Sequence, residues 1–289
     1  YGFDFWYSYG TFDLHLNPMY WSTDAPRDGF AYAGQWGPEH EADQAIAYIE
    51  NAGGTYRDPG KPFALVVGMN PPHTPYQQVP QKYVERYAGK TWRDVINRPN
   101  VNVESRSKVV QNAKKDMVNY LAMVSGVDEQ FGRILNSLEK QGLTGNTVVV
   151  FTSDHGNCLG SNNHATKNVI YDESLRIPFL MRHPGKISPR VDSLLFGAAD
   201  VMPTLLGALG FAEDIPSDVD GKNYAPLFRG REMPRPTGAL FINPSRPDPA
   251  YGERGVRTHR YTLSIRKVRD KPDATKLYDN RQDPYQMSN

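Results

Sequence analysis

The chain has 289 residues, and its 33 lysine and arginine side chains nearly balance 32 aspartates and glutamates, so the formal net charge is only +1. This balance gives no reason to expect nucleic acid or a membrane surface as a partner, and no apolar run approaches the roughly 20 residues that a spanning helix needs. The single cysteine, Cys158, excludes an internal disulfide framework and a cysteine-based zinc site.

The first 38 residues are rich in aromatic residues, glycine and proline without a sustained period, so we expect an ordered loop. Its first residues resemble the interior of a protein sequence rather than a signal peptide. Its aromatic side chains could stack on sugars, but packing in a core is the better expectation; they are Phe3, Phe5, Trp6, Tyr7, Tyr9 and Trp21. A helix is predicted over residues 38–51, because its first turn is acidic and Gly53-Gly54 follow its end.

A buried strand is predicted over the apolar residues 62–69. The proline-rich loop 70–76 follows it and cannot be helical, so His73 is presented at the carboxyl end of the strand. Residues 77–106 are expected to be irregular.

The longest helical pattern comes next, with apolar residues at three- and four-residue steps from Met117 to Leu138. A strand is predicted over residues 147–153, and strand, loop, long helix and strand in this order favour a parallel sheet. A third strand over residues 177–181 and a short helix over residues 199–209, closed by Gly210, complete this part.

After about residue 235 the chain forms short alternating segments, at residues 239–242, 255–257 and 261–265, which predict antiparallel strands. We therefore expect an α/β fold whose mostly parallel sheet is sandwiched by helices, with a small C-terminal α+β subdomain. The predicted domains are residues 1–235 and residues 236–289.

Asp154 and His155 follow the 147–153 strand directly. Ligands in open α/β sheets bind just beyond the carboxyl ends of the strands. A carboxylate beside an imidazole at such a point indicates a metal site or an acid/base pair.

Three blocks of residues stand out along the chain; they are Asn70–Tyr76, then Ser153–Gly156 with Leu159-Gly160, Lys167 and Tyr171–Pro178, then Leu277–Asp279 with Asp283-Pro284 and Asn289. In this order they resemble the histidine loop, the metal and lysine segment, and the motif that closes the C-terminal subdomain of the type I sulfatases. These sulfatases are metal-dependent enzymes of the alkaline phosphatase superfamily. The resemblance implies an alkaline-phosphatase-like fold and a sulfuric ester hydrolase that acts on a sulfated carbohydrate.

The resemblance also implies roles for single residues. Asp154 would bind a divalent cation, usually calcium, and His155 would be the neighbouring ligand or would instead orient Asp154 or the substrate. His73 would give a hydrogen bond or a proton to the bridging oxygen of the ester, unless it only caps its own loop. Lys167 would place its ammonium group against the sulfate oxygens, whereas a lone lysine is ordinarily solvated surface.

Two positions depart from the family pattern. Asn162 stands where relatives often have a histidine, and His164 lies nearby, so both are weaker candidates for substrate binding, with plain surface as the alternative for His164. Cys158 replaces a residue that is commonly acidic, and we expect it to be a passive small side chain.

The formylglycine nucleophile of these sulfatases is made from a C/S-x-P-S-R type motif, which this sequence lacks. The paired aspartates that complete the metal site are also missing. The chain is therefore identified as the C-terminal portion of a sulfatase, and this segment alone is predicted to be inactive.

Two other functions remain open. A phosphodiesterase, phosphonate hydrolase or phosphatase of the same superfamily would share the sheet and the metal positions. A non-catalytic protein that binds sulfated glycans would explain the missing nucleophile. Periplasmic, extracellular or lysosomal location is indicated by the resemblance only.

Overall fold

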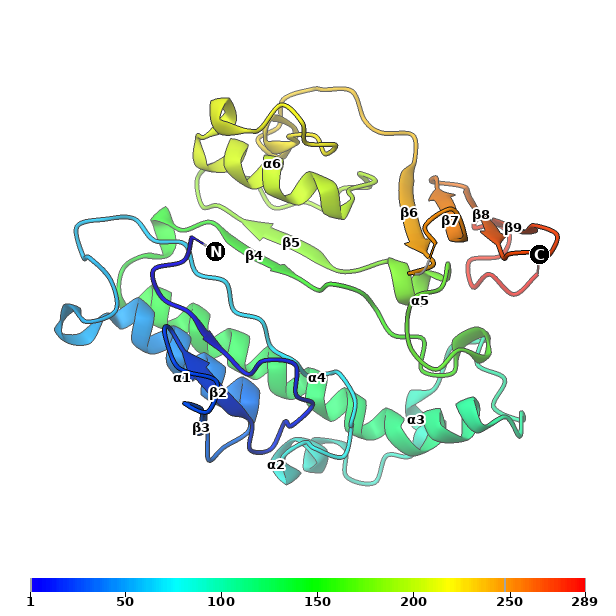
Figure 1. Ribbon diagram of the computed structural model, residues 1–289, viewed down its shortest axis with the longest axis horizontal. Helices are drawn as coiled ribbons and strands as arrows, with labels where there is room; N and C mark the ends of the chain where they lie inside the picture. Colours follow the sequence, from blue (N-terminus) through cyan, green and yellow to red (C-terminus); the bar gives the residue numbers. More distant parts are fainter. Residues whose placement is uncertain (1, 247, 289) are drawn as a thin grey trace. The chain divides into compact units, whose positions relative to one another are not determined.

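The computed structural model describes residues 2–246 and 248–288, which form two compact units (Figure 1). One unit comprises Tyr1–Asn97 and Gln111–Thr144, and the other comprises Arg98–Val110 and Gly145–Asn289. This division does not follow the predicted boundary near residue 235, which stays a prediction.

The helices of the first unit agree with the sequence pattern. Helix α1 (Gly37–Glu50) ends at Asn51, whose φ of 49° is left-handed, just before the predicted glycine stop. The long helix α4 (Lys108–Lys140) extends beyond the apolar pattern at both ends. A short helical turn, η1 (Ala52–Gly54), follows α1. The segment expected to be irregular, residues 77–106, contains only the short helical turns α2 (Gln81–Val84), η2 (Glu85–Tyr87) and α3 (Trp92–Val95) before α4 begins.

The expected loop at the start of the chain contains a small antiparallel sheet instead. Its strands are β1 (Tyr7–Ser8), β2 (Met19–Ser22) and β3 (Ala31–Tyr32), with β2 in the middle. Strands of two to four residues are too short for an alternating pattern to emerge, so the loop prediction was wrong for these strands, while most of the remaining segment is loop. The expected core position was also wrong for Phe3 and Trp6, which are exposed.

The strand predicted over residues 62–69 was wrong as well. This segment is extended, but in the described part of the chain it belongs to no hydrogen-bonded ladder, and Val66 is exposed. An apolar, β-branched sequence favours an extended backbone, whereas a strand also needs a neighbouring strand to pair with.

In the second unit, the two predicted strands are present as β4 (Val149–Thr152) and β5 (Phe179–Arg182). They pair antiparallel, with Val149 opposite Arg182, and not in the parallel sense expected for the sheet. Apolar runs identify strands but carry no information on their direction. The remaining helices are η3 (Thr144–Asn146), η4 (Ser161–Asn163), α5 (Asp172–Leu175), α6 (Ala198–Leu209), η5 (Ala212–Asp214) and α7 (Ala225–Phe228).

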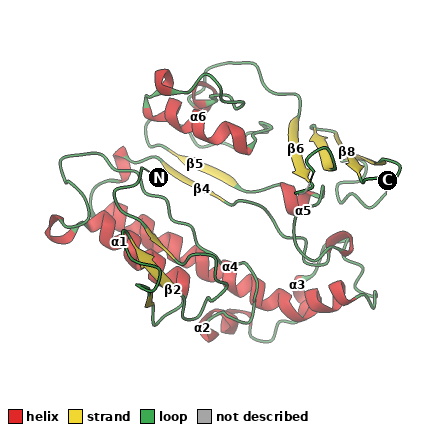
Figure 2. Ribbon diagram, in the orientation of Figure 1, coloured by secondary structure: helices red, strands yellow, loops and turns green. Residues whose placement is uncertain are grey.

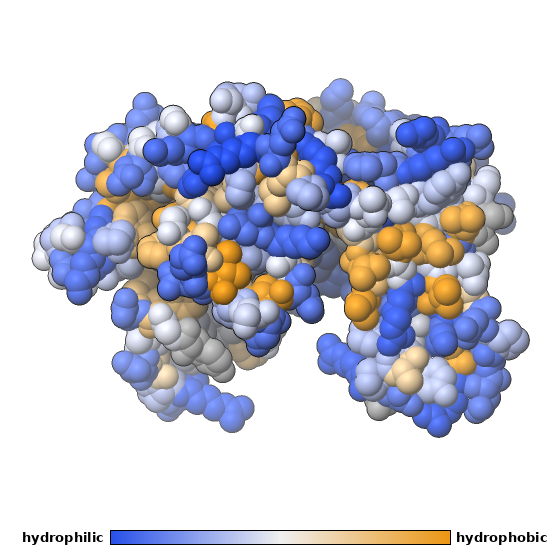
Figure 3. Space-filling model, turned by 90° about the horizontal axis from the view of Figure 1, so that it is seen from above, coloured by the Kyte–Doolittle hydropathy of each residue, from blue (hydrophilic) through white to orange (hydrophobic). Residues whose placement is uncertain are grey.

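The C-terminal strands form the antiparallel sheet that the sequence predicts (Figure 2). It contains β6 (Ala239–Pro244), β7 (Gly252–Arg257), β8 (Tyr261–Lys267) and the unpredicted β9 (Ala274–Asp279). One face packs Phe241 and Tyr278 against Ile170 and Tyr171. The other face is apolar and exposed, with Leu240 among its open side chains, and apolar atoms gather on the corresponding surface in Figure 3.

Among the described residues, we find no helix with the length and apolar character needed to cross a bilayer.

Glu41 is a buried carboxyl group on α1. Its Oε1 accepts a hydrogen bond from the Tyr20 hydroxyl at 2.8 Å, whereas its buried Oε2 has no partner among the described groups. Burial raises the pKa of Glu41 to about 7, although the hydrogen bond from Tyr20 acts in the opposite direction. The folded state therefore holds a proton that the unfolded chain has already released at neutral pH.

The free energy of unfolding should consequently fall as the pH rises from about 4.5, the pKa of an unperturbed glutamate, to about 7. The expected slope is at most about 1.4 kcal/mol per pH unit, the value for one proton. Glu41→Gln should remove this fall, because the amide cannot ionise. The measurement is the unfolding temperature of both proteins at pH 5 and pH 7.5, with the exposed helix residue changed in Glu50→Gln as control; equal pH dependence in all three would contradict the assignment.

Candidate functional site

Asp154 and His155 form a close pair beyond the end of β4. The Asp154 side chain is 82% exposed, and its Oδ2 lies 3.1 Å from Nε2 of His155. On the other side of the imidazole, Nδ1 lies 2.9 Å from the carbonyl oxygen of Gly156. Because a carbonyl oxygen can only accept, Nδ1 carries a proton; with no second proton on the ring, Nε2 is an acceptor that faces another acceptor, Oδ2 of Asp154. Such a pair is stable with a cation or a proton between the two atoms.

Gly156 holds this pair against helix α5. Its backbone N–H donates to the carbonyl oxygen of Ser174 at 2.9 Å. A Cβ atom at Gly156 would lie only 2.0 Å from the carbonyl oxygen of Glu173, so no other residue fits without moving the backbone. The glycine that follows the acid and the imidazole is therefore required by close packing.

Helix α5 is itself fixed by buried polar contacts that sequence reasoning missed. The Glu173 carboxylate, almost fully buried, accepts from Arg98 Nη2 at 2.7 Å and from Asn100 Nδ2 at 2.8 Å. Asp172 binds the Arg257 guanidinium through both carboxylate oxygens, at 3.2 and 3.1 Å. These partners are far apart in the sequence and share no spacing, so only the folded chain reveals them.

Lys167 follows a loop closed by backbone hydrogen bonds. The N–H groups of residues 158, 159 and 160 donate to the carbonyl oxygens of residues 166, 165 and 164, at 2.8, 3.2 and 2.9 Å. Leu159 adopts a left-handed φ of 43°, which is unusual for a bulky residue. This frame fixes the backbone just before Lys167, whose side chain is half-buried.

The two weaker candidates lie within this loop and have structural partners. Asn162 donates from Nδ2 to the carbonyl oxygen of Tyr285 at 3.3 Å. The His164 ring packs on Tyr171, with 5.2 Å between the ring centroids. Burial, and then the charge of Lys276, lower the pKa of His164, so its imidazole is neutral at pH 7. These contacts account for both side chains, and their role in substrate binding stays a prediction.

His73 belongs to the first unit, where its loop packs on residues 13–15. Nδ1 of His73 lies 2.8 Å from the carbonyl oxygen of Thr74 and 3.2 Å from Oδ1 of Asp13. Nδ1 again carries the proton, because both neighbours accept. Nε2 of the neighbouring His15 lies 3.1 Å from the His73 carbonyl oxygen, which ties the two segments together. Asp13 and His15 were missed because they lie in a stretch without a recognisable pattern.

The residues present fit part of a cation site. Donor atoms that share one calcium ion at about 2.4 Å lie about 3 Å apart, close to the distance between Asp154 Oδ2 and His155 Nε2. Calcium needs six to eight ligands, and the described residues contain no group of three or more side chains that could hold a metal ion. A cation held by Asp154 and His155 would therefore need further ligands.

No residue of this chain fits the formylglycine nucleophile. Cys158 is the only cysteine, and its side chain is buried. Burial raises the pKa of its thiol to about 12, so it stays protonated. The prediction of a passive side chain agrees with this environment.

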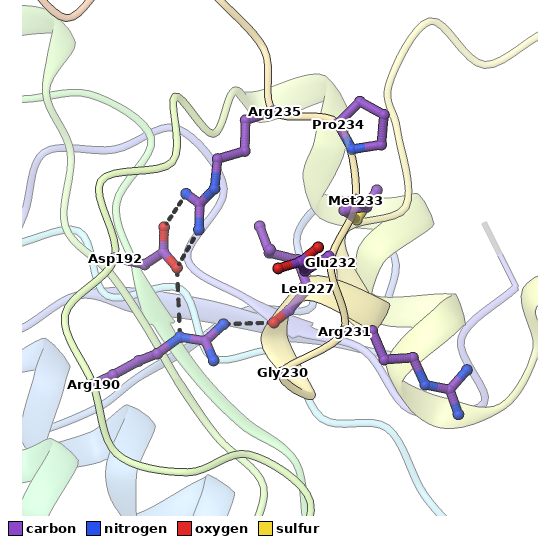
Figure 4. Close-up of a pocket in the computed structure, with 9 residues that line it drawn as sticks. All are labelled: Arg190, Asp192, Leu227, Gly230, Arg231, Glu232, Met233, Pro234 and Arg235. Carbon is purple, nitrogen blue, oxygen red and sulfur yellow. Dashed lines mark hydrogen bonds and ion pairs between the residues drawn. The ribbon is translucent and has the colours of Figure 1, made fainter.

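A cavity of about 730 Å³ lies elsewhere in the second unit, beside residues 227–235 (Figure 4). Its Asp192 carboxylate binds Arg235 at 2.6 and 3.1 Å and Arg190 at 3.4 Å. Hydrogen bonding to Arg235 lowers the pKa of Asp192, so the acid is charged and offsets both arginines. None of the predicted site residues lines this cavity.

Comparison with known proteins links these features to one family. The sulfatase family matches residues 2–211, and the family described as N-sulphoglucosamine sulphohydrolase, C-terminal, matches residues 160–289. An endo-4-O-sulfatase of Bacteroides thetaiotaomicron is 43% identical over 306 residues, and an ulvan-active sulfatase of Formosa agariphila is 30% identical over 295 residues. Both align with all of this chain, which spans 58% and 54% of their lengths, or about half of each relative.

Solved structures confirm the predicted fold class. A sulfatase named YidJ from Bacteroides fragilis superposes with a TM-score of 0.92 and 41% identity, and covers all of this chain and 61% of its own. A phosphonate monoester hydrolase of Agrobacterium radiobacter shares the fold alone, with a TM-score of 0.64 and 20% identity. The match covers 92% of this chain and 57% of the hydrolase chain. The predicted sulfatase resemblance is thus confirmed by the family match and by relatives that align with every part of the chain: the protein belongs to the sulfatase family.

Proposed function

We propose that this chain is the C-terminal part of a sulfuric ester hydrolase that acts on a sulfated carbohydrate. The observation that carries the proposal is the convergence of two acceptor atoms, Asp154 Oδ2 and His155 Nε2, at 3.1 Å on an exposed loop. Because the chain belongs to the sulfatase family, we interpret this pair as part of a sulfatase metal site. The names of the relatives, an endo-4-O-sulfatase and an ulvan-active sulfatase, support a sulfated glycan as the substrate.

Asp154 and His155 would hold a divalent cation, with calcium favoured by the carboxylate ligand. When bound, the cation supplies positive charge against the oxygens of the sulfate group. Asp154 contributes an anionic oxygen. Nδ1–H of His155, bound to the Gly156 carbonyl oxygen, keeps Nε2 available as a ligand.

Lys167 would place a second positive charge against the sulfate oxygens. The closed backbone loop before it fixes the start of its side chain. A charge that is already in position needs no reorganisation during the reaction, and this lowers the barrier.

His73 would protonate the bridging oxygen of the ester. When the sulfur–oxygen bond breaks, the alcohol then leaves as a neutral molecule rather than as an alkoxide. Asp13 and the Thr74 carbonyl oxygen hold Nδ1–H, so Nε2 is the nitrogen that exchanges a proton with the substrate. The nucleophile and the other cation ligands would come from the part of the complete protein that this chain does not contain.

Asp154→Asn should weaken calcium binding by at least about 100-fold in the complete protein, because the amide carries no charge. Sulfate release should fall with it and recover only partly at high calcium. Calorimetric titration of the chelator-treated protein measures the affinity. Asp270→Asn, a change at an exposed turn residue, is the matched control; unchanged affinity in Asp154→Asn would contradict the assignment.

Asp13→Asn should lower kcat about 10- to 100-fold with little change in KM, because the carboxylate orients His73 rather than binding the substrate. His73→Ala should cost about 10²- to 10⁴-fold, the usual contribution of a general acid. Steady-state kinetics on an aryl sulfate provides both values. Asp24→Asn, an exposed residue of the same segment, serves as control, and an effect of Asp13→Asn on KM alone would speak for substrate binding instead.

Residues 1–289 expressed alone should release no sulfate, because no residue of the chain fits the nucleophile. The measurement is sulfate release from an aryl sulfate and from a sulfated oligosaccharide, with the complete protein as the positive control. Turnover by residues 1–289 at a rate near that of the complete protein would overturn the assignment of the missing parts.

A further inference from the structure

Four aromatic rings form a continuous row on the sheet β1–β2–β3, the dark blue region of Figure 1. The centroids of neighbouring rings lie 6.0, 5.4 and 5.7 Å apart. This aromatic row consists of Phe12, Trp21, Phe30 and Tyr32.

Three rings of the row stay open to solvent, although each contacts its neighbour. Phe12 is 47% exposed, Phe30 38% and Tyr32 58%. Tyr20, in contrast, lies on the opposite side of β2 and is buried, and its ring stacks on Tyr7 with centroids 4.9 Å apart. The same short sheet therefore has one aromatic face in a core and one on the surface.

The backbone holds the row in a defined shape. Tyr32 lies opposite Met19 in the ladder between β2 and β3. The Trp21 indole N–H donates to the carbonyl oxygen of Arg27 at 2.9 Å. The turn before Phe30 is tight, because the Gly29 N–H donates to the carbonyl oxygen of Pro26 at 2.8 Å and a Cβ atom at Gly29 would lie 2.7 Å from the proline ring. Binding a ligand on such a surface costs little ordering entropy.

One end of the row is joined to the proposed acid. Phe12 directly precedes Asp13, whose Oδ1 lies 3.2 Å from Nδ1 of His73. The backbone N–H of His15 also donates to Oε1 of Gln78 at 2.6 Å, so this segment is fixed to the His73 loop at two points. The row therefore begins one residue away from the contact between Asp13 and His73.

We propose that the aromatic row binds the sugar rings that flank the sulfated residue of a carbohydrate chain, and this proposal rests on the function proposed above. The C–H faces of a sugar ring are apolar and its hydroxyl groups lie at the rim, so an open aromatic ring covers the apolar face and leaves the hydroxyl groups in water. The row consists only of aromatic rings, which suit this contact. The link from Phe12 through Asp13 to His73 favours the substrate of the proposed acid as the ligand of the row.

The test uses the complete protein and two sulfated substrates, an aryl sulfate and an oligosaccharide of several sugar residues. Phe12→Ala, Phe30→Ala and Tyr32→Ala should each lower kcat/KM on the oligosaccharide roughly fivefold to tenfold, mainly through KM. The same variants should stay within about twofold of the unchanged protein on the aryl sulfate. Phe211→Ala removes a ring that is 52% exposed in the other unit and should affect neither substrate.

Three other results would overturn the proposal. Equal losses on both substrates would indicate an effect on catalysis in general. Unchanged kinetics together with a lowered unfolding temperature would indicate that another part of the complete protein packs on the row. Unchanged kinetics and unfolding temperature would leave the row without a role in binding. If the unchanged protein hydrolyses phosphate or phosphonate esters but no sulfate ester, the proposed function fails independently of these variants.

Discussion

The proposed cation site depends on one backbone contact, between Gly156 and helix α5. The Gly156 N–H binds the Ser174 carbonyl oxygen, and the absence of a side chain lets the two backbones approach closely. The Gly156 carbonyl oxygen then holds Nδ1 of His155, which leaves Nε2 facing Asp154. Helix α5 is fixed in turn by Arg98, Asn100 and Arg257. The exposed Asp154 is thus held in place, through Gly156 and α5, by a buried polar network.

His155 and His73, one in each unit, have the same tautomer but different proposed roles. Each has Nδ1 at a main-chain carbonyl oxygen, that of Gly156 for His155 and that of Thr74 for His73. In both rings this selects the tautomer and directs Nε2 outward. In His155, Nε2 faces the Asp154 carboxylate, which suits a cation. In His73, Asp13 lies at Nδ1 instead, which leaves Nε2 for proton transfer.

The sequence predicted the features that depend on local pattern. Helices α1, α4 and α6 were evident from apolar spacing and from their end signals, and β4 and β5 from their apolar runs. Ladder partners were not predictable: residues 62–69 remain unpaired among the described residues, and β4 pairs antiparallel with β5. Motifs in the sequence predicted the candidate site residues, which are Asp154, His155, His73 and Lys167. The contacts of Asp13, Arg98 and Arg257 were not predicted, because contacts between distant segments produce no periodic pattern in the sequence.

The loop before Lys167 has a consequence for how related proteins can diverge. Its frame consists of hydrogen bonds between main-chain groups of residues 158–160 and 164–166, rather than of contacts between side chains. The side chains at the tip can therefore change between relatives while the lysine that follows keeps its position. With the roles proposed for Asn162, His164 and Lys167, substrate recognition could therefore vary while the lysine stays in place, within ten residues of one chain.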